Sequence, residues 1–262
     1  MIQLSIQAII EWFTRKISGG ERKQDRSSDE AIQTLLIDTY AESEAGDLTT
    51  EIRTIDQITL ACRRMQQAET KGDLIRLLGT EVKRFSLRDL EMMYTRFEEK
   101  TRNLPRQYRN LLLPKVNEQI FSAQHRLLLL ARSGAGDEDE TTLPKAAVSY
   151  FGMIEAAARE KAKTNDPTFL YLKYLLAGFT IFVMEEPAHP VGTPFPGGQI
   201  VDEWEGEYLC PVRDRADGVP FALCPFCPAR QSDEPTYPEM RAVRKERRRK
   251  ELLNNYRTNY KG

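Results

Sequence analysis

Apolar residues recur at a spacing of three or four along most of the first 186 positions. This spacing places them on one face of an α-helix, and the strict alternation that is typical of half-buried strands is almost absent. The apolar run over residues 169–184 contains Lys173 and is shorter than the roughly 20 residues that span a bilayer. We therefore expect a buried core helix there, and a mainly α-helical protein with no transmembrane segment.

Two helical units are expected before residue 187. Residues 1–18 form an amphipathic helix with isoleucines on one face, and two glycines end it. Its polar face carries no row of lysines, which favours packing or docking against a protein over a membrane anchor. Residues 28–186 form a multi-helix domain, in which Ser86 and Asp89 make a capping box and Pro114 predicts a kink.

Helical periodicity stops at Pro187. Ten of the fourteen prolines lie between residues 187 and 238, and proline removes backbone donors and breaks helices. Short extended pieces are expected only at 199–204 and 207–212. A loop of about fifty residues with so little secondary structure does not readily hold its shape unaided. We therefore expect a staple within this segment.

The candidate chemistry of residues 187–238 centres on three cysteines. Cys224 and Cys227 form a Cys-x-x-Cys pair, thirteen residues separate Cys210 from this pair, and His189 stands at the head of the same segment. Three thiolates and an imidazole are a common closed zinc set, and metal binding would add folding free energy. We therefore predict a metal-stapled loop in which Cys210, Cys224 and Cys227 hold zinc, with His189 as the fourth ligand.

Other uses of these thiols stay open. An iron–sulfur cluster would suit cysteines that are followed by proline, as all three are. Cys224 and Cys227 could instead exchange thiol and disulfide, or the three thiols could simply pack. Cys62, the fourth cysteine, lies on an apolar helix face and is interpreted as a core residue.

Three stretches of the proline-rich segment resemble a known family. They are HPVGTPFPGG (residues 189–198), YLCPV (208–212) and ALCPFC (222–227). Together they are similar to an uncharacterised archaeal family found mainly in methanogens, domain of unknown function 2115, whose members combine a helical first part with a cysteine-bearing end. The resemblance implies an anaerobic archaeal cytoplasm, which keeps thiols reduced and iron–sulfur chemistry accessible. It supplies no catalytic residues.

The charge of the chain is uneven. The whole chain holds 38 Lys and Arg against 39 Asp and Glu, yet residues 239–262 carry nine basic residues against three glutamates. A basic C-terminal helix is expected there, and its densest part consists of Arg244, Lys245, Arg247, Arg248, Arg249 and Lys250. This cluster could bind an acidic protein or nucleic-acid phosphates, or it could form a solvated helix that balances the acidic body. No aromatic residue is interleaved with the cluster, which weakens the case for single-stranded nucleic acid.

Acidic residues cluster twice near the end of the helical domain. Glu185 and Glu186 precede His189, and residues 202–207 hold four carboxylates beside Trp204. Glutamates at a helix end are usually solvated, and a hydrolytic pair requires a geometry that spacing alone does not indicate. The chain also lacks a phosphate-binding lysine motif and a Ser/His/Asp set, so an enzyme is not favoured.

The patterns together predict a metal-binding helical accessory or assembly protein that acts through contacts with a protein partner. Zinc is the expected cofactor, and the cytoplasm is the expected location because the chain shows no secretory signal. An iron–sulfur or dithiol redox protein is the first alternative. Nucleic-acid binding through residues 244–250 is the second.

Overall fold

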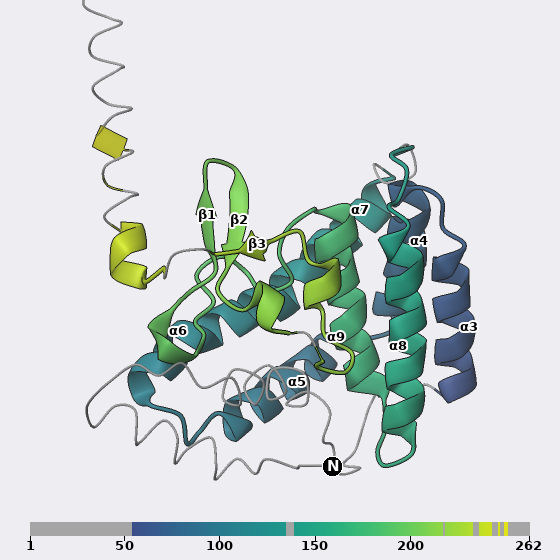
Figure 1. Ribbon diagram of the computed structural model, residues 1–262. Helices are drawn as coiled ribbons and strands as arrows, with labels where there is room; N and C mark the ends of the chain where they lie inside the picture. The colour runs from purple at the N-terminus through teal and green to yellow at the C-terminus, as the bar shows by residue number, and fades with distance from the viewer. Residues whose placement is uncertain are drawn as a thin grey trace, which may run out of the picture.

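The computed structural model describes residues 54–134, 139–216, 218–232, 236–242, 246, 249 and 250. The predicted helix over residues 1–18 and most of the predicted basic helix over 239–262 lie outside these ranges. Helices dominate the described part (Figure 1); they are α3 (Ile55–Gln66), α4 (Lys71–Val82), α5 (Leu87–Lys100), α6 (Arg106–Asn117), α7 (Ala123–Ser133), α8 (Ala146–Ala162) and α9 (Thr168–Gly178). The predicted mainly α-helical class is confirmed.

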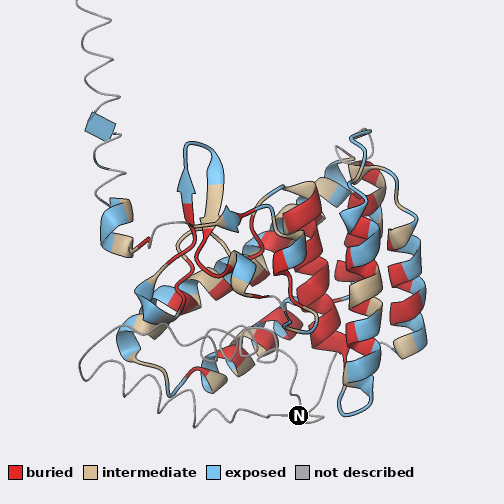
Figure 2. Ribbon diagram, viewed as in Figure 1, coloured by how far each residue is buried: buried red, intermediate tan, exposed pale blue. Residues whose placement is uncertain are grey.

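The helical body is built around α9. This helix contacts α4, α7 and α8, while α3 packs on the outer side of α8. Every residue of α9 is buried, and Figure 2 shows it red along its length. The core helix expected from the apolar run is therefore confirmed, and it includes Lys173, whose exposed fraction is only 6%. None of the described helices is long and apolar enough to cross a membrane.

Three helices begin with a capping box. The expected pair of Ser86 and Asp89 caps α5, and each residue's side chain bonds to the backbone of the other. Thr70 and Asp73 cap α4 in the same way, and α4 begins at Lys71. Each box satisfies backbone donors that the first helical turn leaves without a partner.

Two π-helical turns interrupt otherwise regular helices. The turn η1 (Glu118–Ser122) joins α6 to α7, and η2 (Phe179–Val183) continues α9. Pro114 lies inside α6 without ending it, and η1 begins four residues later. The kink expected at Pro114 stays a prediction. Such turns are rare and often accompany functional sites.

A small sheet stands on the helical body. Strands β1 (Asp202–Trp204) and β2 (Glu207–Cys210) form an antiparallel hairpin, and β3 (Arg230–Gln231) lies parallel to β2. The two turn residues of the hairpin, Glu205 and Gly206, both have positive φ, at 52° and 84°. Two such residues in succession suit the twist of a tight hairpin. The two extended pieces expected from the sequence are confirmed.

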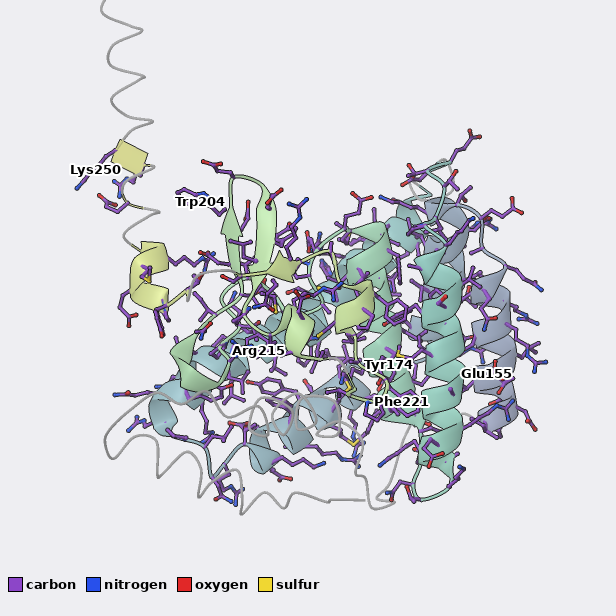
Figure 3. All side chains as sticks on the ribbon, in the orientation of Figure 1. Glu155, Tyr174, Trp204, Arg215, Phe221 and Lys250 are labelled. Carbon is purple, nitrogen blue, oxygen red and sulfur yellow. The ribbon has the colours of Figure 1, made fainter. Side chains whose placement is uncertain are left out.

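The proline-rich segment is held to the helices by its own contacts. The Tyr108 hydroxyl donates to the carbonyl of Pro194 at 3.0 Å, and the Tyr174 hydroxyl donates to that of Phe221 at 3.0 Å. The rings of Tyr150 and Phe226 meet edge to face at 5.1 Å. Figure 3 shows Tyr174 and Phe221 side by side where the segment crosses the body. A metal ion is thus not required to explain how the segment as a whole is positioned.

Gly178 at the end of α9 tests how tightly this core is packed. A Cβ atom there would lie 2.8 Å from Cε1 of the buried Tyr150 ring. We expect Gly178→Ala to lower the free energy of unfolding by about 1–3 kcal/mol through overpacking. The measurement is urea denaturation followed by circular dichroism.

Gly152→Ala is the matched control. The nearest atom to its added Cβ would be Gln66 Nε2, at 4.0 Å. Alanine is the better helix former, so this variant should be neutral or gain up to about 1 kcal/mol. Equal destabilisation by both substitutions would contradict the described packing around α9.

Candidate functional site

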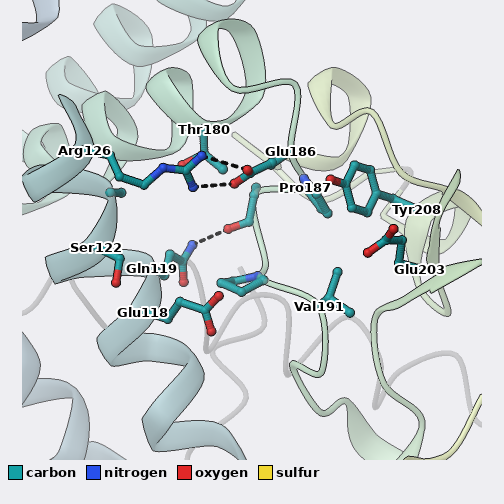
Figure 4. Close-up of a pocket in the computed structure, with 13 residues that line it drawn as sticks. Glu118, Gln119, Ser122, Arg126, Thr180, Glu186, Pro187, Val191, Glu203 and Tyr208 are labelled. Atoms are coloured by element: carbon teal, nitrogen blue, oxygen red, sulfur yellow. Dashed lines mark hydrogen bonds and ion pairs between the residues drawn. The ribbon is translucent and has the colours of Figure 1, made fainter. Parts of the chain in front are cut away.

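A cavity of about 450 Å³ opens between the helical body and the proline-rich segment (Figure 4). The turn η1 supplies Glu118 and Gln119 to its lining, and α7 supplies Arg126. Thr180 comes from η2, so both π-helical turns border the cavity. The opposite wall is formed by residues 186–191 and by the hairpin of β1 and β2. The lining combines charged, hydroxyl and apolar side chains, as small-molecule sites commonly do.

An ion pair crosses one side of this cavity. Arg126 donates two hydrogen bonds to Glu186, from Nη1 to Oε2 at 2.7 Å and from Nη2 to Oε1 at 2.8 Å. The hydrogen bonds that the Glu186 carboxylate accepts raise the pKa of Arg126 further above its usual range. The residue before Glu186, Glu185, has a left-handed backbone with φ of 55°. The chain turns out of the helix at this residue. The fixed fork of the guanidinium makes this contact directional as well as attractive.

Glu203 and Tyr208 face the cavity from the hairpin. They are Cα partners across β1 and β2, so their side chains lie on the same face of the hairpin. Burial raises the pKa of Tyr208, and the nearby carboxylates of Glu186 and Glu203 raise it further, against the effect of Arg126. The phenol therefore keeps its proton at neutral pH and can donate a hydrogen bond.

The three predicted cysteine ligands lie at the ends of short elements. Cys210 is the last residue of β2, Cys224 begins the turn η5 (Cys224–Phe226), and Cys227 follows it. Cys210 is within electrostatic reach of both other thiols. Cys62 is buried in the helical core, as expected. Cys210 therefore lies near both members of the Cys-x-x-Cys pair, and these three residues are called the cysteine cluster below.

Backbone amides point at two of these sulfur atoms. The amide of Val212 donates to Cys210, and the amides of Ala229 and Ala188 donate to Cys227. Proline occupies the position after each cysteine and has no N–H group, so in both turns the donor is the residue two positions on. Amide donors of this kind favour a thiolate over a neutral thiol.

Burial acts in the opposite direction on the same thiols. It raises the pKa of Cys210 to about 12 and also raises the pKa of Cys227. A thiol that exchanges disulfides or acts as a nucleophile usually has a lowered pKa, because the thiolate is the reactive form. In the absence of a cation these cysteines are therefore protonated and poorly reactive.

His189 does not complete a closed metal shell. Its ring packs edge to face on Phe195 at 5.6 Å, and burial together with the charge of Lys173 lowers its pKa to about 4. Among the described residues, no group of three or more histidine, cysteine, aspartate or glutamate side chains is arranged closely enough to hold a metal ion. A metal at Cys210, Cys224 and Cys227 would have to draw the sulfurs closer together.

One residue, Ala188, connects the cysteine cluster to the cavity. The carbonyl of Ala188 accepts a hydrogen bond from Gln119 Nε2 at 2.8 Å in the cavity wall (Figure 4). The amide of the same residue donates to Cys227. Ala188 is thus bonded both to the Cys227 sulfur and to a side chain of the cavity wall.

The predicted basic cluster is described only in part. Arg249 and Lys250 are exposed and lie 3.7 and 3.9 Å from the carboxylate of Glu246. Arg244, Lys245, Arg247 and Arg248 lie outside the described residues. The idea that this cluster binds a partner stays a prediction.

Sequence reasoning missed the cavity. Glu186 was interpreted as a solvated helix-end residue, yet it pairs with Arg126, sixty positions earlier. Glu203 belonged to an acidic segment without an assigned role, and Gln119 carried no signal at all. Spacing along the chain does not reveal such pairs, because their members come from different elements. The two π-helical turns were also not predicted, because the apolar spacing was compared with a regular α-helix of 3.6 residues per turn.

The ion pair of Arg126 and Glu186 should contribute modestly to stability. Its side chains are 39% and 34% exposed, which weakens the attraction by solvent screening. A double-mutant cycle with Arg126→Met and Glu186→Gln should give a coupling energy of about 0.5–1 kcal/mol in urea denaturation. Lys163 and Glu160, at 67% and 61% exposure, provide the control cycle, for which we expect at most about 0.3–0.5 kcal/mol. Equal coupling in the two cycles would contradict the bidentate geometry.

Comparison with known proteins places this site within a family. A UPF0305 protein of Methanothermobacter thermautotrophicus is 43% identical over 82 residues, which cover 31% of this chain and 51% of that protein. The UPF0305 protein of Methanopyrus kandleri is 31% identical over 133 residues, which cover 50% of this chain and 88% of the relative. A third UPF0305 protein, from Methanocaldococcus jannaschii, is 25% identical over 164 residues, which cover 62% of this chain and 96% of that protein. No solved structure matches the chain.

The family match itself spans most of the described structure. Residues 70–232 match the family described as "Uncharacterized protein conserved in archaea (DUF2115)". This range contains every residue that lines the cavity and all three clustered cysteines. The resemblance expected from the cysteine-bearing stretches is confirmed: the chain belongs to this archaeal family, DUF2115.

Proposed function

We propose that this protein is a helical accessory protein of the archaeal cytoplasm whose cysteine cluster takes up a metal ion, zinc first. The observation that carries the proposal is the placement of Cys210 within electrostatic reach of Cys224 and Cys227, with backbone amides aimed at two of the sulfurs. Thiolates are the natural ligands of zinc, and the free state of all four cysteines agrees with a reducing compartment.

A metal suits these thiols better than disulfide exchange does. Burial raises the pKa of Cys210 to about 12, so the thiolate forms only when a cation replaces its proton. The amides of Val212 and Ala229 would then stabilise the bound thiolates. Zinc would fix the local corner between β2 and η5, while the tyrosine and aromatic contacts already hold the rest of the segment.

A surface for a protein partner is supported by the hairpin. Trp204 lies at the end of β1, next to the turn, and is 46% exposed on a hairpin that stands away from the body (Figure 3). Exposed tryptophan is enriched among residues that dominate protein interfaces. The parallel pairing of β2 with β3 ties this hairpin to the cysteine cluster, because Cys210 is paired there.

Metal analysis tests the first part of the proposal. Protein purified without oxygen or chelator should carry about one zinc per chain and no iron or sulfide. Cys210→Ser and Cys227→Ser should each reduce the zinc content to a small fraction, because a closed site needs all its thiolates. Cobalt(II) substituted into metal-free protein should show thiolate-to-metal charge-transfer absorption that the two variants lose.

The control for metal binding is Cys62→Ala. This cysteine is fully buried in the helical core and should keep the metal content unchanged. His189→Asn tests the predicted fourth ligand separately from the three cysteines. Unchanged zinc content in this variant would exclude His189 as a zinc ligand. Metal-free protein that fails to take up added zinc or cobalt would overturn the proposal, and iron with sulfide would establish the iron–sulfur alternative instead.

The partner surface has a separate test. Affinity purification from native archaeal extract should retain a protein with the wild type and lose it with Trp204→Ala. Leu60→Ala is the matched control, because Leu60 is similarly exposed at 52% but lies on α3. Identical retained proteins for wild type and Trp204→Ala would remove the hairpin from the interface.

Binding of nucleic acid stays the weaker alternative. It depends on basic residues beyond position 243, which lie outside the range that matches the family. The described members, Arg249 and Lys250, already lie near Glu246. A steep loss of binding with added salt, removed by truncating residues 244–262, would be needed to support it.

A further inference from the structure

The cavity beside Arg126 is large enough for a small molecule. Its volume of about 450 Å³ falls within the roughly 300–1,000 Å³ that is usual for ligand sites. Its walls come from η1, α7, η2, residues 186–191 and the hairpin, so it lies where five separate parts of the chain meet. The zinc proposal makes no use of this space.

The charges around the cavity favour a cation. Glu118 is paired with Lys115 at 2.6 Å, and Glu186 is paired with Arg126. Glu203 faces the cavity with no ion pair among the described residues. Two of the three carboxylates in the lining are therefore neutralised by ion pairs, and the negative charge of Glu203 remains.

An anion is disfavoured by the same arrangement. Among the described residues, Arg126 is the only basic one in the lining, and both of its terminal nitrogens already donate to Glu186. An anion would have to displace Glu186 and would then lie among three carboxylates. A cation meets no such conflict, since it adds a partner for Glu203 and leaves the ion pair intact.

Uncharged residues in the lining define the rest of the ligand. Val191, Pro187 and Pro190 give the wall of the segment an apolar surface. Tyr208 lies beside Glu203 on the hairpin, so an aromatic ring and a hydroxyl are both next to the unpaired carboxylate. Aromatic faces attract cationic groups, and short alkyl chains pack on proline and valine.

We propose that this cavity binds a small organic cation, namely an amine or guanidine group on a short aliphatic chain. Glu203 holds the cationic head beside Tyr208, and the apolar wall of residues 187–191 packs against the chain. The ion pair of Arg126 and Glu186 closes the opposite side.

Isothermal titration calorimetry with agmatine, putrescine and spermidine tests this proposal on the full chain. At least one of these amines should give a saturable isotherm with one site, and sodium phosphate should give none. Because Glu203 is exposed and its charge is screened by water, Glu203→Gln should weaken that binding by about fivefold. Glu205→Gln removes the same charge from the same hairpin outside the cavity, so it should change the affinity by less than about twofold.

A second variant separates an enclosed site from general attraction to negative charge. Val191→Phe keeps every charge but places a bulky ring in the apolar wall and narrows the cavity, so it should weaken amine binding while thermal unfolding shows that the fold is retained. The proposal is overturned if no amine saturates, or if Glu203→Gln and Glu205→Gln weaken binding equally. Unchanged amine binding in Val191→Phe, or saturable binding of phosphate instead of amines, would overturn it as well.

Discussion

Burial of α9 on every side is the constraint on which the rest of the structure depends. A helix enclosed along its whole length removes much apolar surface from water, at about 25 cal/mol per Å², and its neighbours must approach it closely. Gly178 has no side chain, so the Tyr150 ring can pack directly against α9 at this position. The Tyr150 hydroxyl donates a hydrogen bond to the carbonyl of Tyr174 at 2.7 Å. The Tyr174 hydroxyl in turn donates to Phe221. The core is thereby connected to the cysteine-bearing segment.

The way the chain leaves α9 determines both candidate sites. The turn η2 and the left-handed Glu185 direct the chain so that Glu186 meets Arg126 across the cavity. Two residues later, Ala188 bonds to Gln119 on one side and to Cys227 on the other. Because a single residue contacts both sites, a metal at the cysteines and a ligand in the cavity are expected to influence each other.

Most of the helical architecture was predictable, since it rests on local rules. The capping box of Ser86 and Asp89, the core helix with Lys173 and the short strands of the hairpin are all confirmed. A metal staple was expected because a segment of about fifty residues with little secondary structure does not readily hold its shape, but this expectation overlooked contacts with distant helices. Tyr108 and Tyr174 hold the segment by hydrogen bonds to Pro194 and Phe221, across 86 and 47 positions of the chain. Sequence patterns describe residues that are close along the chain, so they do not predict contacts between residues this far apart.

The amino-acid sequence by itself determined the helical class, the point at which helices give way to the proline-rich segment, and the choice of three cysteines as candidate metal ligands. Periodicity, proline and the Cys-x-x-Cys spacing act over a few residues, so they can be read directly. Only the tertiary structure decided that Glu186 pairs with Arg126, that Glu203 faces a cavity and that the His189 ring turns to Phe195. These outcomes depend on which distant elements pack together, because side-chain partners are chosen by burial and shape in three dimensions.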